Sequence, residues 1–283
     1  MTESIPKLPL ADVVEVIVSW LQANVGWLFD FISNLIEPTV AFFTAVLMFL
    51  PTLVTIVLIA ALTWWLSSWR IALFTLIGLM LIANLGYWEE SAQTTALVLT
   101  ATVISIIIGV PIGILCGKND TARNIITPIL DFMQTMPAFV YLVPAVIFFS
   151  LGTVPGVIAS VVFSMPPTIR LTNLGIRQVP EDLIEASDAF GSTSSQKLFK
   201  IQLPLAKTTI MAGINQTIML ALSMVVIASM IGARGLGEAV LTAVQRIEVG
   251  TGFEAGLAIV IIAIVLDRLT QNLGQGNGQH PRN

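Results

Sequence analysis

The chain has 283 residues, of which 55% are hydrophobic and only 11% are charged, and its mean hydropathy is +0.89. Soluble domains carry about 25% charged residues, so this composition indicates a protein embedded in a membrane. The formal net charge of -4 comes without a basic patch for nucleic acid, and one cysteine, Cys116, with one histidine, His280, excludes an internal disulfide and a metal-ligand cluster.

The N-terminal segment, residues 1–50, has no basic start followed by a short apolar core, so we expect no cleaved signal peptide. Its apolar residues recur at three- and four-residue intervals, which predicts an amphipathic helix at the membrane interface over about 12–36. The alternative is a first spanning helix, which would place Asp30 and Asn34 at a depth where a charge costs a few kcal/mol. Residues 40–50 form either an approach to the first span or an additional crossing.

Apolar segments of the length needed to cross ~30 Å of hydrocarbon recur along the rest of the chain. The expected spans are 51–69, 71–87, 91–115, 128–150, 154–171, 209–231 and 253–269. We therefore predict an all-α polytopic membrane protein with about seven spanning helices in a transmembrane domain over 51–271 and a polar tail at 272–283.

Basic residues gather at those ends of the expected spans that all lie on one side of the membrane. They are Arg70, Lys118, Arg123, Arg170, Arg177, Lys197, Lys200, Lys207 and Arg268. Because Lys and Arg are enriched in cytoplasmic connections, this pattern predicts an external N-terminus and a cytoplasmic C-terminus.

Three glycines at four-residue spacing, Gly109, Gly113 and Gly117, fall on one helix face, where they allow the backbone of a neighbouring helix to approach closely. We interpret them as a packing seam. The run GILCGKND that ends this helix lacks the first glycine and the Ser or Thr of a phosphate-binding loop, so we expect no ATP to bind there.

The longest polar stretch between spans is the loop at 172–208. Gly191 can supply the left-handed residue that ends a short helix. Ser194 or Ser195 can cap a second short helix that ends before Pro204. This helix, glycine, helix element is expected to protrude into the cytoplasm and to dock into a groove on a soluble partner.

The same loop resembles the signature of binding-protein-dependent ABC importer permeases, which is Glu-Ala-Ala, three residues, Gly, nine residues, Ile, one residue, Leu-Pro. Every spacing matches, and only Ser187 departs from the signature, at the second alanine. The matching residues are Glu185, Ala186, Gly191, Ile201, Leu203 and Pro204. The resemblance implies that this loop couples the spans to an ATPase subunit.

Residues 131–149 and 231–271 resemble the glycine betaine and proline betaine branch of these permeases, so that the whole resemblance covers roughly 93–271. It implies a type I ABC importer transmembrane domain and the permease subunit of an importer for glycine betaine or a related compatible solute. It also implies three partners in a bacterial cell membrane: a second copy of the permease, an ATPase subunit and an external solute-binding protein. ATP and Mg would be held by the ATPase, and no cofactor is expected in this chain.

Polar residues within the expected spans are candidates for the translocation pathway, since polarity in hydrocarbon usually faces a cavity or a partner. They are Asp131, Gln134, Asn215, Gln216 and Ser223. Hydrogen bonding between helices is an equally acceptable role for each of them.

Two other classes of membrane protein fit the sequence less well. An ion-coupled secondary transporter would need broken helices in paired halves with ionisable residues near the midplane, and the sequence has no such repeat. A membrane enzyme would need a nucleophile with a base or a metal cluster, and no HExxH or GxSxG motif occurs. We therefore expect a transport subunit and not an enzyme.

Overall fold

The computed structural model describes residues 9–274, and all regular secondary structure in this part of the chain is helical. The helices are α1 (Leu10–Met48), α2 (Thr52–Leu66), α3 (Trp69–Asn84), α4 (Trp88–Lys118), α5 (Asp120–Thr135), a 3-10 turn (Ala138–Tyr141), α6 (Leu142–Phe149), α7 (Thr153–Arg177), α8 (Glu181–Ala189), α9 (Ser194–Lys197), a π-helical turn (Leu198–Gln202), α10 (Leu203–Ser229), α11 (Leu236–Arg246) and α12 (Val249–Gly274). Most of the expected C-terminal tail, with His280, lies outside the described residues.

Long apolar helices make up most of the described chain. Five are long and apolar enough to cross a membrane, namely α1, α4, α7, α12 and the continuous run 194–229, and α5 with the segment 138–149 adds a bent sixth. The prediction of an all-α polytopic membrane protein is confirmed.

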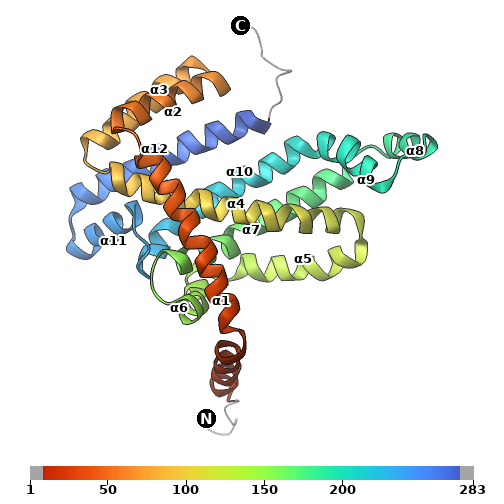
Figure 1. The fold of residues 1–283 in the computed structure, drawn as a ribbon, viewed down its shortest axis with the longest axis horizontal. Coiled ribbons are helices and arrows are strands. Elements are labelled where there is room, and N and C mark those ends of the chain that lie inside the picture. The colour runs from red at the N-terminus through yellow and green to blue at the C-terminus, as the bar shows by residue number, and fades with distance from the viewer. Residues whose placement is uncertain (1–8, 275–283) are drawn as a thin grey trace, which may run out of the picture.

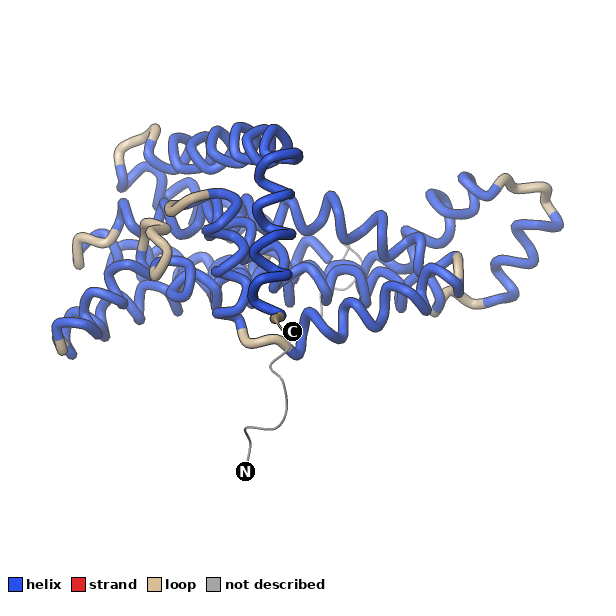
Figure 2. Tube along the Cα trace, turned by 90° about the horizontal axis from the view of Figure 1, so that it is seen from below, coloured by secondary structure: helices blue, strands red, loops and turns tan. Residues whose placement is uncertain are grey.

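A three-helix layer of α4, α7 and α10 forms the centre of the molecule, and Figures 1 and 2 show its helices running side by side along the long axis. Leu97, Val98, Val157, Ala221 and Val225 are almost fully buried in the core that joins these helices. The short helices α8 and α9 project from one end of this layer, and α11 lies at the opposite end (Figure 1).

Close approach of α4 to α7 depends on the three glycines of the expected packing seam. A methyl group added at Gly113 would lie 2.5 Å from Cβ of Thr172 and 2.8 Å from the backbone oxygen of Ile169. Added methyl groups at Gly109 and Gly117 would lie 3.0 Å and 2.8 Å from α7 side chains. Since real Cβ atoms do not pack this tightly, the geometry supports the packing role expected for the seam.

The expected span 128–150 is not one helix, and this prediction was wrong. Helix α5 already begins at Asp120, because the side chain of Asn119 accepts hydrogen bonds from two backbone N–H groups and caps it. The chain then bends by 108° between α5 and the segment 138–149. The bend follows from Pro137, since the residue before a proline is driven out of helical geometry, and Met136 has an extended ψ of 136°.

The expected spans 51–69 and 71–87 are shorter in the structure than the sequence predicted. Helices α2 and α3 have 15 and 16 residues. At 1.5 Å per residue each is roughly 23 Å long, which is less than the ~30 Å hydrocarbon core. The two helices pack against each other as a hairpin, which Figure 1 shows beside one end of α12.

Helix α1 is a single helix of 39 residues, so the division between an amphipathic helix at 12–36 and a separate segment at 40–50 was wrong. Pro38 lies inside it without ending it. The helix is long enough to span, yet Figure 1 shows it crossing over the α4 and α7 layer and not running parallel to it. Its contacts with α4, α6 and α7 fix this crossing arrangement.

Candidate functional site

The loop between α7 and α10 is built around Gly191. Helix α8 ends in a left-handed residue, because Gly191 has φ of +74°. The Gly191 N–H donates to the Asp188 carbonyl at 2.9 Å, and the Ser192 N–H donates to the Ser187 carbonyl at 3.0 Å. These two bonds form a Schellman motif, which ends a helix and reverses the chain. The predicted glycine hinge is therefore a rigid, fully hydrogen-bonded turn.

Helix α9 starts one residue earlier than the sequence suggested. Thr193, and not Ser194 or Ser195, caps it: the Thr193 hydroxyl accepts from the Gln196 N–H, and the Gln196 side chain accepts from the Thr193 N–H. This reciprocal pair is a capping box, which the Thr-x-x-Gln spacing carries in the sequence.

The second helix of the loop does not end before Pro204, as had been expected. It passes through the π-helical turn 198–202 directly into α10, with Pro204 in the first turn of α10. Pro204 lacks an N–H to donate, and it directly follows the π-helical turn, where the regular i→i−4 hydrogen-bond pattern is already interrupted. The run from Ser194 to Ser229 is therefore continuous, so the tip of the loop is joined to the core of the molecule by one helix.

The residues that carry the signature divide into two groups. Glu185, Ala186, Gly191 and Pro204 are exposed, and Ile201 and Leu203 are partly buried. Leu203 packs against the small cluster of Ile176, Ala206 and Ile210. The exposed residues thus face solvent, and Leu203 anchors the loop to α7 and α10.

Large apolar side chains are exposed on the same projecting element. The relative exposure is 91% for Phe190, 65% for Phe199 and 42% for Leu183. A polar loop that serves only to connect two spans gains nothing from an exposed phenyl ring at its tip. Aromatic side chains in this position suit a pocket on another protein.

The pathway candidates are distributed over two different environments. Gln216 and Ser223 are exposed on one face of α10, together with Met219, and Gln134 is exposed near the end of α5. Asp131 instead forms an ion pair with Arg170 of α7, with 2.6 Å between the carboxylate and the guanidinium. Asp131 therefore joins α5 to α7.

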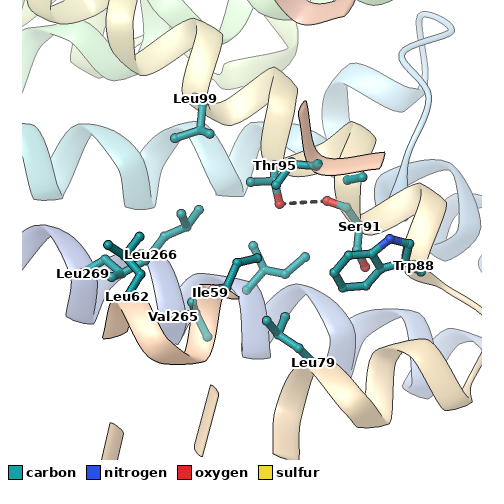
Figure 3. Close-up of a pocket in the computed structure, with 13 residues that line it drawn as sticks. Ile59, Leu62, Leu79, Trp88, Ser91, Thr95, Leu99, Val265, Leu266 and Leu269 are labelled. Atoms are coloured by element: carbon teal, nitrogen blue, oxygen red, sulfur yellow. Dashed lines mark hydrogen bonds between the residues drawn. The ribbon is translucent and has the colours of Figure 1, made fainter. Parts of the chain in front are cut away.

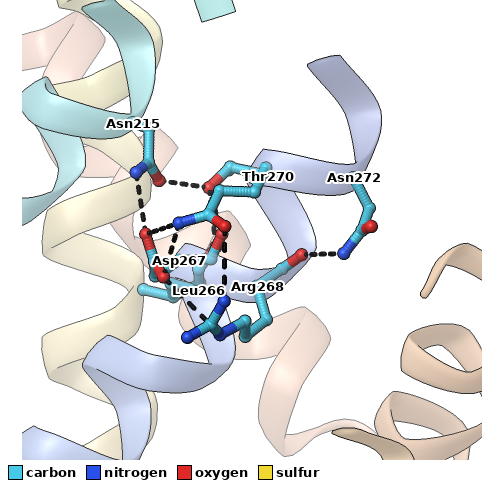
Figure 4. A network of polar contacts seen from close by, with 7 residues as sticks. Asn215, Leu266, Asp267, Arg268, Thr270 and Asn272 are labelled. Atoms are coloured by element: carbon cyan, nitrogen blue, oxygen red, sulfur yellow. Dashed lines mark hydrogen bonds and ion pairs between the residues drawn. The ribbon is translucent and has the colours of Figure 1, made fainter. Parts of the chain in front are cut away.

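Asn215 belongs to a network of polar side chains between α10 and α12 (Figure 4). Its amide nitrogen donates to the Asp267 carboxylate at 2.7 Å, and its amide oxygen accepts from the Thr270 hydroxyl at 2.7 Å. Gln271 also donates to Asp267, at 2.8 Å. Asn215 is thus satisfied by helix-to-helix bonds, the alternative role that the sequence left open.

An apolar cavity of about 260 Å³ lies between α2, α3, α4 and α12 (Figure 3). Aliphatic side chains form most of its wall, with Trp88 and Ser91 at one end. The hydroxyl of Thr95 turns to the Ser91 carbonyl, at 2.8 Å, and so is already paired. Such a cavity offers no charged group to a polar solute.

Comparison with known proteins decides the class. Residues 109–277 match the family described as the inner membrane component of binding-protein-dependent transport systems. This chain belongs to that family. It is a multi-pass membrane component of an ABC importer and not an enzyme in its own right, as the loop signature led us to expect.

Related permeases are similar over nearly the whole chain. The glycine betaine transport system permease protein OpuAB of Bacillus subtilis (strain 168) is 59% identical, over 96% of each chain. The glycine betaine/carnitine transport permease protein GbuB of Listeria monocytogenes is 55% identical, over 95% of this chain and 96% of GbuB. ProW of Escherichia coli (strain K12), a glycine betaine/proline betaine permease, is 47% identical over 91% of this chain and 75% of ProW.

The fold is also that of a solved importer. A structure titled as an inward-facing conformation of the MetNI methionine ABC transporter matches with a TM-score of 0.57 and 22% identity, covering 67% of this chain and 93% of that one. The predicted fold class, a type I ABC importer transmembrane domain, is confirmed.

Two features of the site were not found from the sequence. Phe190 was not singled out, because a sequence does not show which apolar side chains remain exposed. The π-helical turn at 198–202 was also missed, since no particular amino-acid pattern marks a π-helical turn in a sequence.

Proposed function

We propose that this chain is the permease subunit of an ATP-driven importer that brings glycine betaine or a related compatible solute into a bacterial cell. The proposal rests on the relatives, since permeases 59% and 55% identical to this chain are named for glycine betaine transport. Such solutes are zwitterions with no net charge, which is compatible with a core that contains few charged residues.

The ATPase partner is proposed from the geometry of the projecting loop. The single observation that carries it is the exposed phenyl ring of Phe190, held next to the Schellman turn at Gly191. We propose that α8 and α9 insert into a groove on a separate ATPase subunit, which holds ATP and Mg. Closure of the ATPase pair would then move α10, because α9 continues into it without a break.

Two further partners complete the proposed assembly. A second copy of this chain would form a symmetric dimer, with the pathway between equivalent helices. The exposed residues Gln216 and Ser223 of α10, and Gln134 of α5, are proposed to face that pathway. An external solute-binding protein would deliver the solute at the end of the molecule opposite α8 and α9.

We propose that the N-terminus lies outside and the C-terminus lies in the cytoplasm. The support is the charge distribution: Lys197, Lys200 and Lys207 lie at the end of the molecule that carries α8 and α9. Since Lys and Arg are enriched on the cytoplasmic side, this end faces the ATPase.

Uptake by whole cells tests the proposed function. A bacterium deficient in osmolyte transport would express this chain with its ATPase and binding-protein partners, and uptake of radiolabelled glycine betaine would be measured at high osmolarity. We expect uptake that disappears when any one of the three components is omitted. Competition by unlabelled carnitine, choline and proline betaine would define the range of solutes.

Import of another solute by the same three components would retain the mechanism and contradict the assigned substrate. Uptake by this chain alone would contradict the mechanism.

A further inference from the structure

A groove at the end of the molecule opposite α8 and α9 has the features of a solute site. It has a volume of about 680 Å³ and lies between the second half of α1, the start of α4, the turn before α7 and the segment after α10. Helices α7 and α10 both run between this end and the end that carries α8 and α9. The groove therefore lies on the external side in the proposed orientation.

Two opposite charges and an apolar wall line this groove. Glu37 of α1 and Arg234 of the segment between α10 and α11 are its charged residues, and Val40, Phe149 and Val154 belong to its apolar wall. Each ion pair among residues 9–274 joins other residues, so the carboxylate and the guanidinium do not neutralise each other directly. Both side chains are exposed to the groove solvent.

The backbone that carries Arg234 is fixed on both sides. The Gly152 N–H donates to the Ile231 carbonyl at 2.9 Å, and the Leu236 N–H donates to the Thr94 hydroxyl at 2.8 Å. Gly235 has φ of +126°, and a methyl group added there would lie 2.5 Å from the Thr94 hydroxyl oxygen. A rigid segment therefore presents a guanidinium that has no carboxylate partner.

The opposite wall is fixed as well. Phe29 of α1 stacks on Phe148 with 4.5 Å between ring centroids and makes a T-shaped contact with Phe149 at 5.5 Å between centroids. The Gln22 side chain donates to the Ile147 carbonyl at 2.9 Å. These contacts hold α1 against α6, and so hold Glu37 and Phe149 on the walls of one groove.

We propose that this groove is the site at which the permease first receives its solute from the binding protein, and that Arg234 and Glu37 recognise the two ends of a zwitterion. This assignment rests on the proposed function. The guanidinium of Arg234 would bind the solute carboxylate, for which its planar fork is suited. The Glu37 carboxylate and the face of Phe149 would attract the quaternary ammonium group.

The balance of charges distinguishes a zwitterion from other solutes. A site for an anion or a cation would be expected to carry a charge of one sign, whereas one acidic and one basic residue line this groove. Methyl groups of a betaine ammonium also match the aliphatic part of the wall. A transit site has to release its solute again, so weak binding through two exposed charges is sufficient.

The test uses the complete assembly in proteoliposomes, with the ATPase and saturating binding protein loaded with radiolabelled glycine betaine. Uptake and binding-protein-stimulated ATP hydrolysis are measured in parallel for Arg234→Gln, Arg234→Lys and Glu37→Gln. The matched controls are Arg246→Gln and Glu248→Gln, which change exposed charges at the end of α11, outside the groove. Thermal unfolding in detergent reports whether each variant is folded.

We expect Arg234→Gln to lower uptake per ATP hydrolysed by at least tenfold, with stimulation of hydrolysis within twofold of wild type. Arg234→Lys should retain part of the uptake, and Glu37→Gln should lower uptake as well, because each of the two residues binds a different end of the zwitterion. Both controls should match wild type.

Three results would overturn the assignment. Wild-type uptake by a folded Arg234→Gln variant would show that the groove does not handle the solute. Loss of hydrolysis in parallel with uptake would make the groove a docking surface for the binding protein. A wild-type assembly that imports no glycine betaine would overturn the proposed function and this assignment together, whereas the first two results overturn the assignment alone.

Discussion

Lys197 lies 2.5 Å from the carboxylate of Asp188, and this ion pair joins α9 to α8 across the turn at Gly191. The relative exposure is 20% for the Lys197 side chain and 54% for that of Asp188. Exposed pairs contribute about 0–1 kcal/mol. We therefore predict that Lys197→Gln changes glycine betaine uptake by less than about twofold, measured in cells that express all three subunits. A larger loss would mean that Lys197 also contacts the ATPase.

The Gly191 backbone has a larger expected effect. A residue with a Cβ costs about 1–2 kcal/mol in the left-handed conformation, which changes the ratio of two states roughly five- to thirtyfold. Gly191→Ala should therefore reduce uptake several-fold while membrane insertion persists. Gly191→Asn should retain more activity, because asparagine tolerates this conformation. Equal activity of Gly191→Ala and wild type would contradict the role of the turn.

Phe190→Ala should weaken binding of the ATPase. A buried aromatic anchor in an interface is worth about 2 kcal/mol or more, which is roughly thirtyfold in affinity. The affinity is measured by titrating the purified permease with the ATPase. The permease itself should unfold at an unchanged temperature, since the ring is 91% exposed. Phe253→Ala, at a side chain 70% exposed at the start of α12, is the matched control and should bind normally.

Gly113→Ala should destabilise the permease by about 1–3 kcal/mol, because the added methyl group has to displace Thr172 or the α7 backbone. Thermal unfolding in detergent measures this effect. Gly256→Ala, in α12, is a suitable comparison, since nothing lies within 4 Å of the added methyl group. Similar unfolding temperatures for both variants would contradict the close packing of α4 on α7.

Asn215 and Asp267 should behave as a coupled pair. Hydrogen bonds between membrane helices contribute about 0.5–1.5 kcal/mol. A double-mutant cycle of Asn215→Ala and Asp267→Ala, followed by unfolding, should give a coupling energy in that range. Strict additivity would mean that the bond between the two side chains does not stabilise the fold, and would return Asn215 to the pathway candidates.

The coupling loop was the most predictable part of this molecule, because local chemistry fixes it. A left-handed glycine and a Thr-x-x-Gln capping box each act within a few residues, so their spacing is visible in the sequence. The error over Ser194 and Thr193 was a displacement of one residue. The expected helix end before Pro204 was wrong, because the π-helical turn carries the chain directly into α10.

The membrane-spanning part was less predictable, since hydropathy shows which segments are apolar but not where a helix bends or which way its side chains face. The bend before Pro137 lies within an apolar stretch, and the continuity of α1 through Pro38 breaks the usual rule that proline ends a helix. Whether Asn215 faced a pathway or another helix depended on Asp267, 52 residues away. The groove around Arg234 combines four distant segments and has no local signal at all.

The most direct test of the central claim is the energy source of transport. The purified permease, ATPase and binding protein would be reconstituted in proteoliposomes, and uptake of radiolabelled glycine betaine would be measured with ATP supplied on the ATPase side or with an imposed ion gradient and no ATP. We predict uptake that requires ATP and all three proteins and that continues when ionophores collapse the gradients. Uptake by the permease alone, driven by the ion gradient and abolished by ionophores, would contradict the account and identify a secondary transporter.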